Sequence, residues 1–188
     1  MGRWEPNARG RLEQAALALY SERGFEQTTV AQIAERAGLT ERTFFRHFAD
    51  KREVLFWGAD TLHELLVSTI AEAPGSAAPI DAVGAALQAV AAVFHGRRES
   101  SRQRQAIIAA NPELQERELI KLASLAAALA DSLRRRGVTD LAASVAAETG
   151  IAVFKVAFDR WITETSPHDL PHLIRESLDE LKAVTAAK

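Results

Sequence analysis

The chain has 188 residues, and its 47% hydrophobic and 26% charged residues give the balance of a folded globular protein rather than of a disordered chain. It has no cysteine, which excludes disulfides, iron-sulfur clusters, thiolate zinc sites and thiol nucleophiles. A formal net charge of -2 argues against coating of nucleic acid by bulk charge, although residues 1–52 hold nine basic and seven acidic side chains. Apolar runs are short and the N-terminal segment is charged, so the sequence predicts a cytoplasmic protein without a signal peptide or membrane span.

Apolar residues recur at helical spacing along almost the whole chain, so we expect an all-α fold of about nine helices. The first helix is expected over residues 8–23, because an apolar stripe there is followed by Gly24. Thr29 and Gln32 have the spacing of a capping box, which indicates a short second helix that ends at Gly38.

A third helix is expected from the N-cap Thr40, with Phe44 and Phe48 one turn apart on its inward face. Asp50 is the expected cap of a fourth helix over residues 51–72. A stretch rich in proline, glycine and alanine then acts as a linker. Beyond it, a basic segment at 97–104 interrupts the further helices, which we expect over 81–96, from Asn111 to Arg136, over 140–165 and from Asp169 to about 186.

The segment from Thr29 to Phe48 has the order helix, short turn, helix that defines a helix-turn-helix. An ordinary helical corner has the same glycine and apolar spacing, so the pattern alone leaves both interpretations open. The third helix adds a polar first turn, in which side chains reach base edges when the helix lies in a major groove.

Lys51 and Arg52 stand at the predicted start of the fourth helix, where the helix dipole disfavours each cation by roughly 0.3 to 1 kcal/mol. Their position is explained if a phosphate binds there, because helix N-termini and cations together form an anion site. Solvated charges that merely flank the Asp50 cap are the alternative.

The residues from Tyr20 to Phe56 read YSERGFEQTTVAQIAERAGLTERTFFRHFADKREVLF. This segment resembles the DNA-binding head of the TetR (tetracycline-repressor) family, and the resemblance is dense from Arg11 to Leu55. It implies a three-helix head of residues 1–50 and a helical ligand-binding and dimerisation domain of residues 51–188. The implied function is that of a ligand-responsive regulator, commonly a repressor, which binds a palindromic operator as a homodimer and is released by a small-molecule effector.

The resemblance also implies roles for single residues. Glu41 and Arg42 match base-reading positions, and we expect Arg42 to bind a guanine through two hydrogen bonds. Phe45 departs from the family pattern, because most relatives carry a tyrosine there whose hydroxyl meets a phosphate. Phe45 is then expected to pack on a sugar or a thymine methyl, with Arg46 supplying the phosphate contact. The predicted DNA-contacting residues are Thr29, Thr40, Glu41, Arg42, Thr43, Phe45, Arg46, His47 and Lys51.

A ligand cavity in the body is implied by the family alone. Its predicted walls are Leu62, Leu66, Phe94, Ile107, Ile108 and Phe158. The arginines of the basic segment (Arg97, Arg98, Arg102 and Arg104) suit an acidic or phosphate-bearing group, as in acyl-coenzyme-A-like ligands of some relatives; a solvated loop is the alternative.

The last two helices are expected to pair with their copies in a dimer. The stripe assigned to this interface is Leu170, Leu173, Ile174, Leu178 and Leu181, and the alternative is that it packs inside one chain. His168 and His172 have the spacing of two metal ligands, but no third ligand lies near them in sequence, so we expect no metal and no cofactor.

Two functions other than that of a regulator are an enzyme and a protein-interaction bundle. No nucleophile elbow, P-loop or dinucleotide fingerprint is present, so the chain is not expected to be an enzyme. A helical protein-interaction bundle without DNA binding is the remaining alternative, and the polar face of the third helix argues against it.

Overall fold

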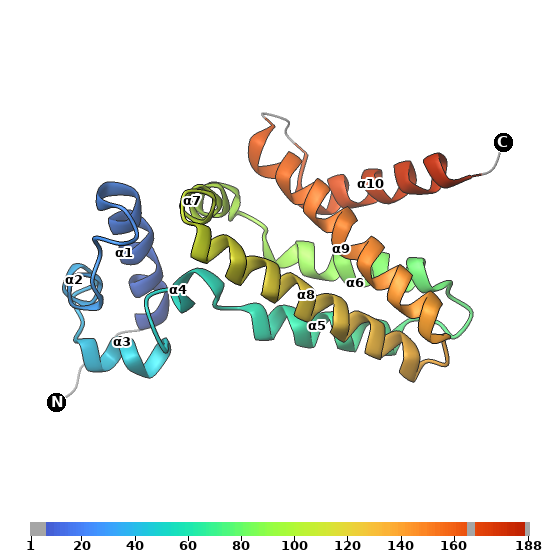
Figure 1. Ribbon diagram of the computed structural model, residues 1–188, viewed down its shortest axis with the longest axis horizontal. Helices are drawn as coiled ribbons and strands as arrows, with labels where there is room; N and C mark the ends of the chain where they lie inside the picture. The colour runs from blue at the N-terminus through green and yellow to red at the C-terminus, as the bar shows by residue number, and fades with distance from the viewer. Residues whose placement is uncertain (1–6, 165–167, 187–188) are drawn as a thin grey trace. The chain divides into compact units, whose positions relative to one another are not determined.

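The computed structural model describes residues 7–164 and 168–186, and within these ranges the only regular structure is α-helix (Figure 1). This confirms the expected all-α fold. The helices are α1 (Ala8–Arg23), α2 (Val30–Arg36), α3 (Glu41–His47), α4 (Glu53–Phe56), α5 (Ala59–Glu72), α6 (Pro79–Val93), α7 (Arg98–Ala109), α8 (Pro112–Arg135), α9 (Asp140–Thr163) and α10 (Leu170–Thr185).

The chain forms two compact units. The first unit consists of Met1–Gly58 and Ser100–Glu118, and the second unit consists of Ala59–Glu99 and Leu119–Lys188. Each unit has its own hydrophobic core. The N-terminal helices therefore share a core with a segment that lies far along the sequence.

The first unit is built on short helices with well-defined ends. The capping box predicted at Thr29 is present: its hydroxyl accepts from the backbone N of Gln32 at 3.2 Å, and the Gln32 side chain accepts from the N of Thr29 at 3.0 Å. Leu12 of α1, Ile33 of α2 and Phe44 of α3 are fully buried in one core. Three short helices thus share one apolar centre.

Two expected elements differ in the structure. The prediction of a single helix over residues 51–72 is wrong, because α4 ends at Phe56. Gly58 takes a φ of 89°, which places it in the left-handed region that a helix does not visit. The basic segment at 97–104 is not a loop, since most of it lies in α7. Apolar periodicity did not indicate this helix, because most residues of the segment are polar.

The second unit is held together by close packing of small residues. A Cβ placed on Gly150 of α9 would lie 2.3 Å from Cγ1 of Val83 of α6, so only glycine allows this approach. By length and composition α9 is apolar enough to cross a membrane, yet Ala143, Ala147 and Ala157 are fully buried among other helices of the unit. It is a core helix of the second unit.

Most of the leucine stripe of α10 packs within its own unit. Leu170, Leu173 and Ile174 are at most 1% exposed and belong to the core of their own unit, while Leu178 and Leu181 pack half-buried against it. Leu170, Leu173 and Ile174 therefore offer no surface to a second chain, because they are already buried within one, while a role of Leu178 and Leu181 in a dimer stays a prediction.

Candidate nucleic-acid interface

The turn between α2 and α3 is tight and fully hydrogen-bonded. The backbone N of Leu39 donates to the carbonyl of Ala34 at 2.8 Å, and Gly38 has a φ of 66°. The guanidinium of Arg11 donates to the carbonyl of Ala37, and a Cβ on Gly38 would lie 2.8 Å from that guanidinium. The positive φ therefore favours glycine here, and the turn fixes the angle between the two helices.

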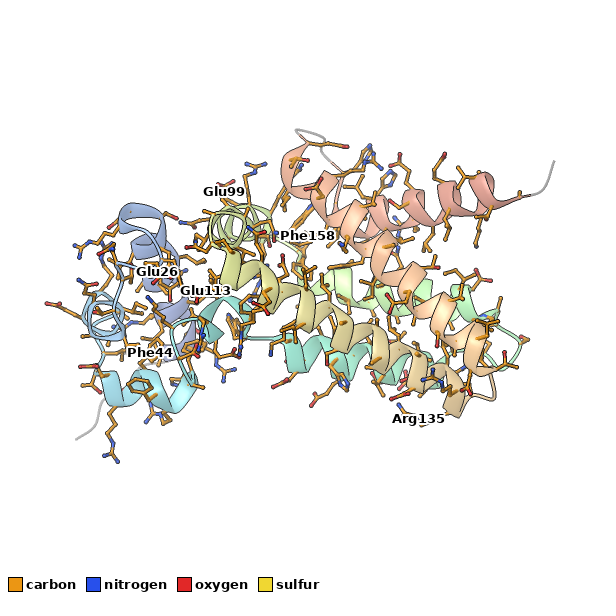
Figure 2. The ribbon with its side chains drawn as sticks, in the orientation of Figure 1. Glu26, Phe44, Glu99, Glu113, Arg135 and Phe158 are labelled. Atoms are coloured by element: carbon orange, nitrogen blue, oxygen red, sulfur yellow. The ribbon has the colours of Figure 1, made fainter. Side chains whose placement is uncertain are left out.

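The helix α3 has one buried and one exposed side. Phe44 is 0% and Phe48 4% exposed, and their rings contact each other with centroids 5.4 Å apart (Figure 2 labels Phe44). Arg42 lies two residues before Phe44 and Arg46 two residues after it, which is about half a helical turn in each direction, and both are exposed. The burial of two phenylalanines thus turns two arginines outward.

The start and flank of α3 complete its exposed side. Thr40 caps the helix, since its hydroxyl accepts from the backbone N of Thr43 at 3.2 Å, and Glu41 is exposed beside it. Phe45 is 55% exposed, with its ring held edge-on by Phe44 at 5.5 Å. The exposed side of α3 therefore carries an apolar ring beside its two arginines.

Lys51 is engaged by the protein itself. Its Nζ donates to the carbonyls of Phe25, Glu26 and Thr28 at 2.9, 3.2 and 3.1 Å, and lies 4.4 Å from the centroid of the Phe25 ring. The hydroxyl of Tyr20 donates to the carbonyl of Lys51 at 2.6 Å. An ammonium has three N–H donors, so binding a phosphate requires this one to release a carbonyl.

The neighbouring Arg52 also has a local partner. It forms an ion pair with Asp50 at 2.8 Å, and Oδ1 of Asp50 accepts from the backbone N of Arg52 and of Glu53. Burial raises the pKa of Asp50, but the hydrogen bonds from Arg52 and from the two backbone N–H groups outweigh it and leave the pKa below its usual range. This geometry favours the interpretation that Arg52 is a charge that flanks the Asp50 cap rather than part of a phosphate site.

His47 lies at the end of α3 in a positive environment. Burial lowers its pKa, and Arg46 and Arg9 lower it further, so the imidazole is neutral at pH 7. Its Nε2 is buried without a hydrogen-bond partner among the described residues. Arg9 also lies over the ring of Trp57 at 5.4 Å. Arg9 is distant from His47 in sequence, and the packing of α1 beside the end of α3 brings it there.

The six residues predicted to line a ligand cavity do not come together. Leu62, Leu66, Phe94 and Phe158 belong to the core of the second unit, whereas Ile107 and Ile108 are buried in the core of the first. The structure therefore separates the six residues between two cores, because α7 contributes its apolar side to the N-terminal helices.

Phe94 lies in an aromatic cluster of the second unit. Its ring meets that of Phe158 edge-on at 5.6 Å and that of Trp161 at 6.1 Å, and Phe154 stacks on Phe158 at 5.6 Å (Figure 2 labels Phe158). Phe94, Phe154 and Phe158 are only partly buried. Of the arginines expected near a ligand, Arg97 and Arg98 lie in the second unit, and Arg102 and Arg104 lie in the first.

Two helices joined by a tight turn, the second with a buried aromatic side and a cationic outer side, define the class of helix-turn-helix DNA-binding proteins. A family model described as bacterial regulatory proteins of the tetR family matches residues 13–56, and a model described as the MftR C-terminal domain matches residues 77–186. The chain belongs to the TetR family of bacterial transcriptional regulators.

Among curated relatives, MftR of Mycobacterium tuberculosis is 27% identical over 170 residues, which cover 88% of this chain and 85% of that protein. The regulator TcmR of Streptomyces glaucescens is 39% identical over 82 residues; the match covers 44% of this chain and only 36% of TcmR.

Two solved structures share the fold. FadR of Bacillus subtilis in complex with stearoyl-CoA has a TM-score of 0.66 at 18% identity, covering 95% of this chain and 99% of that one. FadR of Thermus thermophilus in complex with lauroyl-CoA has a TM-score of 0.56 at 22% identity, covering 96% of each chain.

We predict that Lys51→Met lowers the free energy of unfolding by about 2–3 kcal/mol, because three carbonyls lose a charged donor. Urea denaturation followed by circular dichroism measures this at one protein concentration. Arg46→Met is the matched control, since the exposed Arg46 should change stability by less than about 0.5 kcal/mol. Equal stabilities of the two variants would contradict the structural role of Lys51.

Proposed function

We propose that this protein is a ligand-responsive repressor that binds a two-fold symmetric operator as a homodimer and leaves it when a small molecule binds. The observation that carries the proposal is the outward cationic side of α3, opposite the buried Phe44, on a helix-turn-helix of this family. A cytoplasmic location goes with this proposal, because the operator is there. The division into a DNA-binding domain of residues 1–50 and a ligand and dimer domain of residues 51–188 stays a prediction.

In this proposal α3 lies in a major groove, with Glu41 and Arg42 at base edges. Arg46 contacts a phosphate, and a neutral His47 donates one hydrogen bond to the DNA backbone. Thr29, Thr40 and Thr43 are proposed to contact the DNA as well. Phe45 supplies apolar surface to a sugar or a thymine methyl. Lys51 contributes mainly by shaping the loop before α2, a change from the role that the sequence suggested.

Selection of bound sequences from random duplex DNA by the full-length chain tests the proposal, and a palindromic consensus is expected. Arg42→Ala should weaken specific binding by ~1 to 3 kcal/mol and relax the preference at one position of each half-site. Arg134→Ala is the control, because this exposed arginine lies in the second unit and pairs with Asp131 at 2.7 Å. An unchanged consensus with Arg42→Ala would show that Arg42 reads no base.

A homodimer is proposed through the last two helices, by exposed residues other than the buried part of the leucine stripe. On α9, Leu141, Val145 and Val156 are 78%, 57% and 55% exposed, and Val184 of α10 is 69% exposed. Leu141 and Val145 are one turn apart, and Val156 follows after three further turns, so the three share a side of the helix. Exposed apolar residues gathered on one side of a helix, here with the exposed Glu148 among them, are typical of a surface covered by a second chain.

We predict that Val145→Glu converts the dimer to a monomer, because it places two like charges near a two-fold axis in an apolar interface. Sedimentation velocity at micromolar concentration measures the change. Leu119→Glu is the matched control: Leu119 is 60% exposed on α8 and outside the proposed interface, so this variant should remain a dimer. If Leu119→Glu dissociates while Val145→Glu does not, the interface lies on α8.

The effector is proposed to bind in the second unit beside Leu62, Leu66, Phe94 and Phe158. The half-buried rings of the aromatic cluster support an effector with a large apolar part, since such rings gain by further burial. The FadR proteins of Bacillus subtilis and Thermus thermophilus hold acyl-CoA thioesters, which makes these the first class to test.

Lauroyl-CoA is expected to lower the affinity for the selected operator, and Phe158→Ala should weaken this response by roughly tenfold or more through lost apolar burial. Fluorescence anisotropy of labelled operator measures both effects, with coenzyme A alone as the control for its charges. If neither lauroyl-CoA nor stearoyl-CoA releases the operator, acyl-CoA is not the effector class.

A further inference from the structure

The exposed side chains of α3 form rows along the helix. Successive residues are turned by about 100°, so residues four apart lie one above the other on the same side. Arg42 and Arg46 lie opposite the buried Phe44 and form a central row. Glu41 and Phe45 form a second row along one flank of the first, and both are exposed. We call this second row, Glu41 and Phe45, the flank row.

The flank row has no favourable partner on a DNA backbone. Phosphates repel the carboxylate of Glu41, and the ring of Phe45 has no hydrogen-bond donor for them. This ring is 55% exposed, and its edge-on contact with Phe44 at 5.5 Å fixes its direction. Because the carboxylate avoids phosphates, the row that carries it lies over base edges when α3 is in a major groove. The aromatic ring of the same row then lies over bases rather than over a sugar.

Two features of pyrimidines in the major groove match the flank row. The hydrogen-bond donors of the bases there are amino groups, N4 of cytosine and N6 of adenine, and the C5-methyl of thymine is an apolar group. A carboxylate accepts from such an amino group, and an aromatic ring packs against the methyl. Phe45 therefore favours thymine, whereas Glu41 by itself suits either cytosine or adenine.

Arg42 decides between cytosine and adenine as the partner of Glu41. It follows Glu41 directly in the chain and belongs to the neighbouring row, so the two side chains reach the same step of the groove from adjacent directions. An arginine binds O6 and N7 of guanine through two hydrogen bonds, and guanine pairs with cytosine. One C·G pair therefore satisfies both residues, whereas an adenine paired with thymine leaves the arginine without its two acceptors.

The rise of the helix sets the distance between the two bases that the flank row meets. Glu41 and Phe45 are four residues apart, which is about 6 Å along the axis of an α-helix. Successive bases of one strand are about 3.4 Å apart along the DNA axis. The bases opposite the two side chains are therefore one or two positions apart.

We propose that α3 reads a cytosine and a thymine, one or two positions apart on the same strand of each half-site. N4 of the cytosine donates to Glu41, Arg42 binds the guanine that pairs with this cytosine, and Phe45 contacts the C5-methyl of the thymine. This inference rests on the proposed function and deepens it, because it names bases of the operator. Phe45 is then a specificity-determining residue and does not contact the sugar.

Removal of a single methyl from the DNA tests the role of Phe45 without a change in the protein. Each thymine of one half-site of the selected operator is replaced in turn by deoxyuridine, and fluorescence anisotropy measures the affinity of the full-length chain. At one position the loss of the buried methyl should weaken binding about fourfold. With Phe45→Ala the same replacement should have no effect. Equal affinity for both bases at every position overturns the inference, as does an effect that persists in Phe45→Ala.

Selection from random duplex DNA by Glu41→Ala tests the role of the carboxylate. The variant should lose about tenfold of the preference for the C·G pair, at the same base pair at which Arg42→Ala relaxes the preference. Glu22→Ala is the matched control, because it removes the same charge from α1, where Glu22 pairs with Arg36 at 2.6 Å. This control should select the consensus of the wild type.

Two outcomes of this selection overturn the inference. In the first, Glu41→Ala and Arg42→Ala relax the preference at different base pairs. In the second, Glu41→Ala selects the wild-type consensus and has a lower melting temperature, because Glu41 merely stabilises the first turn of α3 through the helix dipole.

The consensus of the wild type separates this inference from the proposed function. A palindromic consensus whose half-sites hold no cytosine and thymine at this spacing on one strand overturns the inference and leaves the proposed function intact. If the wild type selects no consensus at all, the proposed function is contradicted and the inference with it.

Discussion

The burial of Phe44 is the constraint on which the DNA-binding surface depends. The ring is fully enclosed by the core that α1 and α2 build, and it pins a helix of only seven residues that has little stability of its own. Because side chains follow one another at fixed angles around a helix, one buried ring decides where all the others point. Arg42 and Arg46 are outward for that reason, and the tight turn at Gly38 sets the angle of the whole helix.

Two cations around this core donate to backbone carbonyls and are not free to bind DNA. The ammonium of Lys51 satisfies three carbonyls of the loop before α2, and Arg104 satisfies the carbonyl of Leu55 in α4. A buried cation is retained only where such acceptors and a carboxylate compensate its desolvation. Lys51 and Arg104 thus complete the fold of the first unit, whereas the exposed Arg42 and Arg46 on α3 are available to a polyanion.

The alternative of an interaction bundle without DNA binding shares the all-α fold, but it gives no reason for the exposed side of α3. Family membership and that surface agree on a regulator. The second unit is less constrained in its function. Its aromatic cluster and the exposed residues on one side of α9 are apolar, and apolar contacts are non-directional. The cluster therefore favours a class of ligand and the α9 residues favour a partner chain, but neither identifies a particular molecule.

The sequence by itself determined the all-α fold, the capping box at Thr29 and the inward position of Phe44, because these depend on neighbours within a few residues. Only the tertiary structure decided which buried side chains share a core. In the tertiary structure Ile107 and Ile108 belong to the core of the first unit, and the α10 stripe packs against the core of its own chain. Lys51 likewise finds its carbonyl partners there. Helical periodicity tells which side of a helix is apolar, but not what covers it, since the covering residues lie far away in the chain.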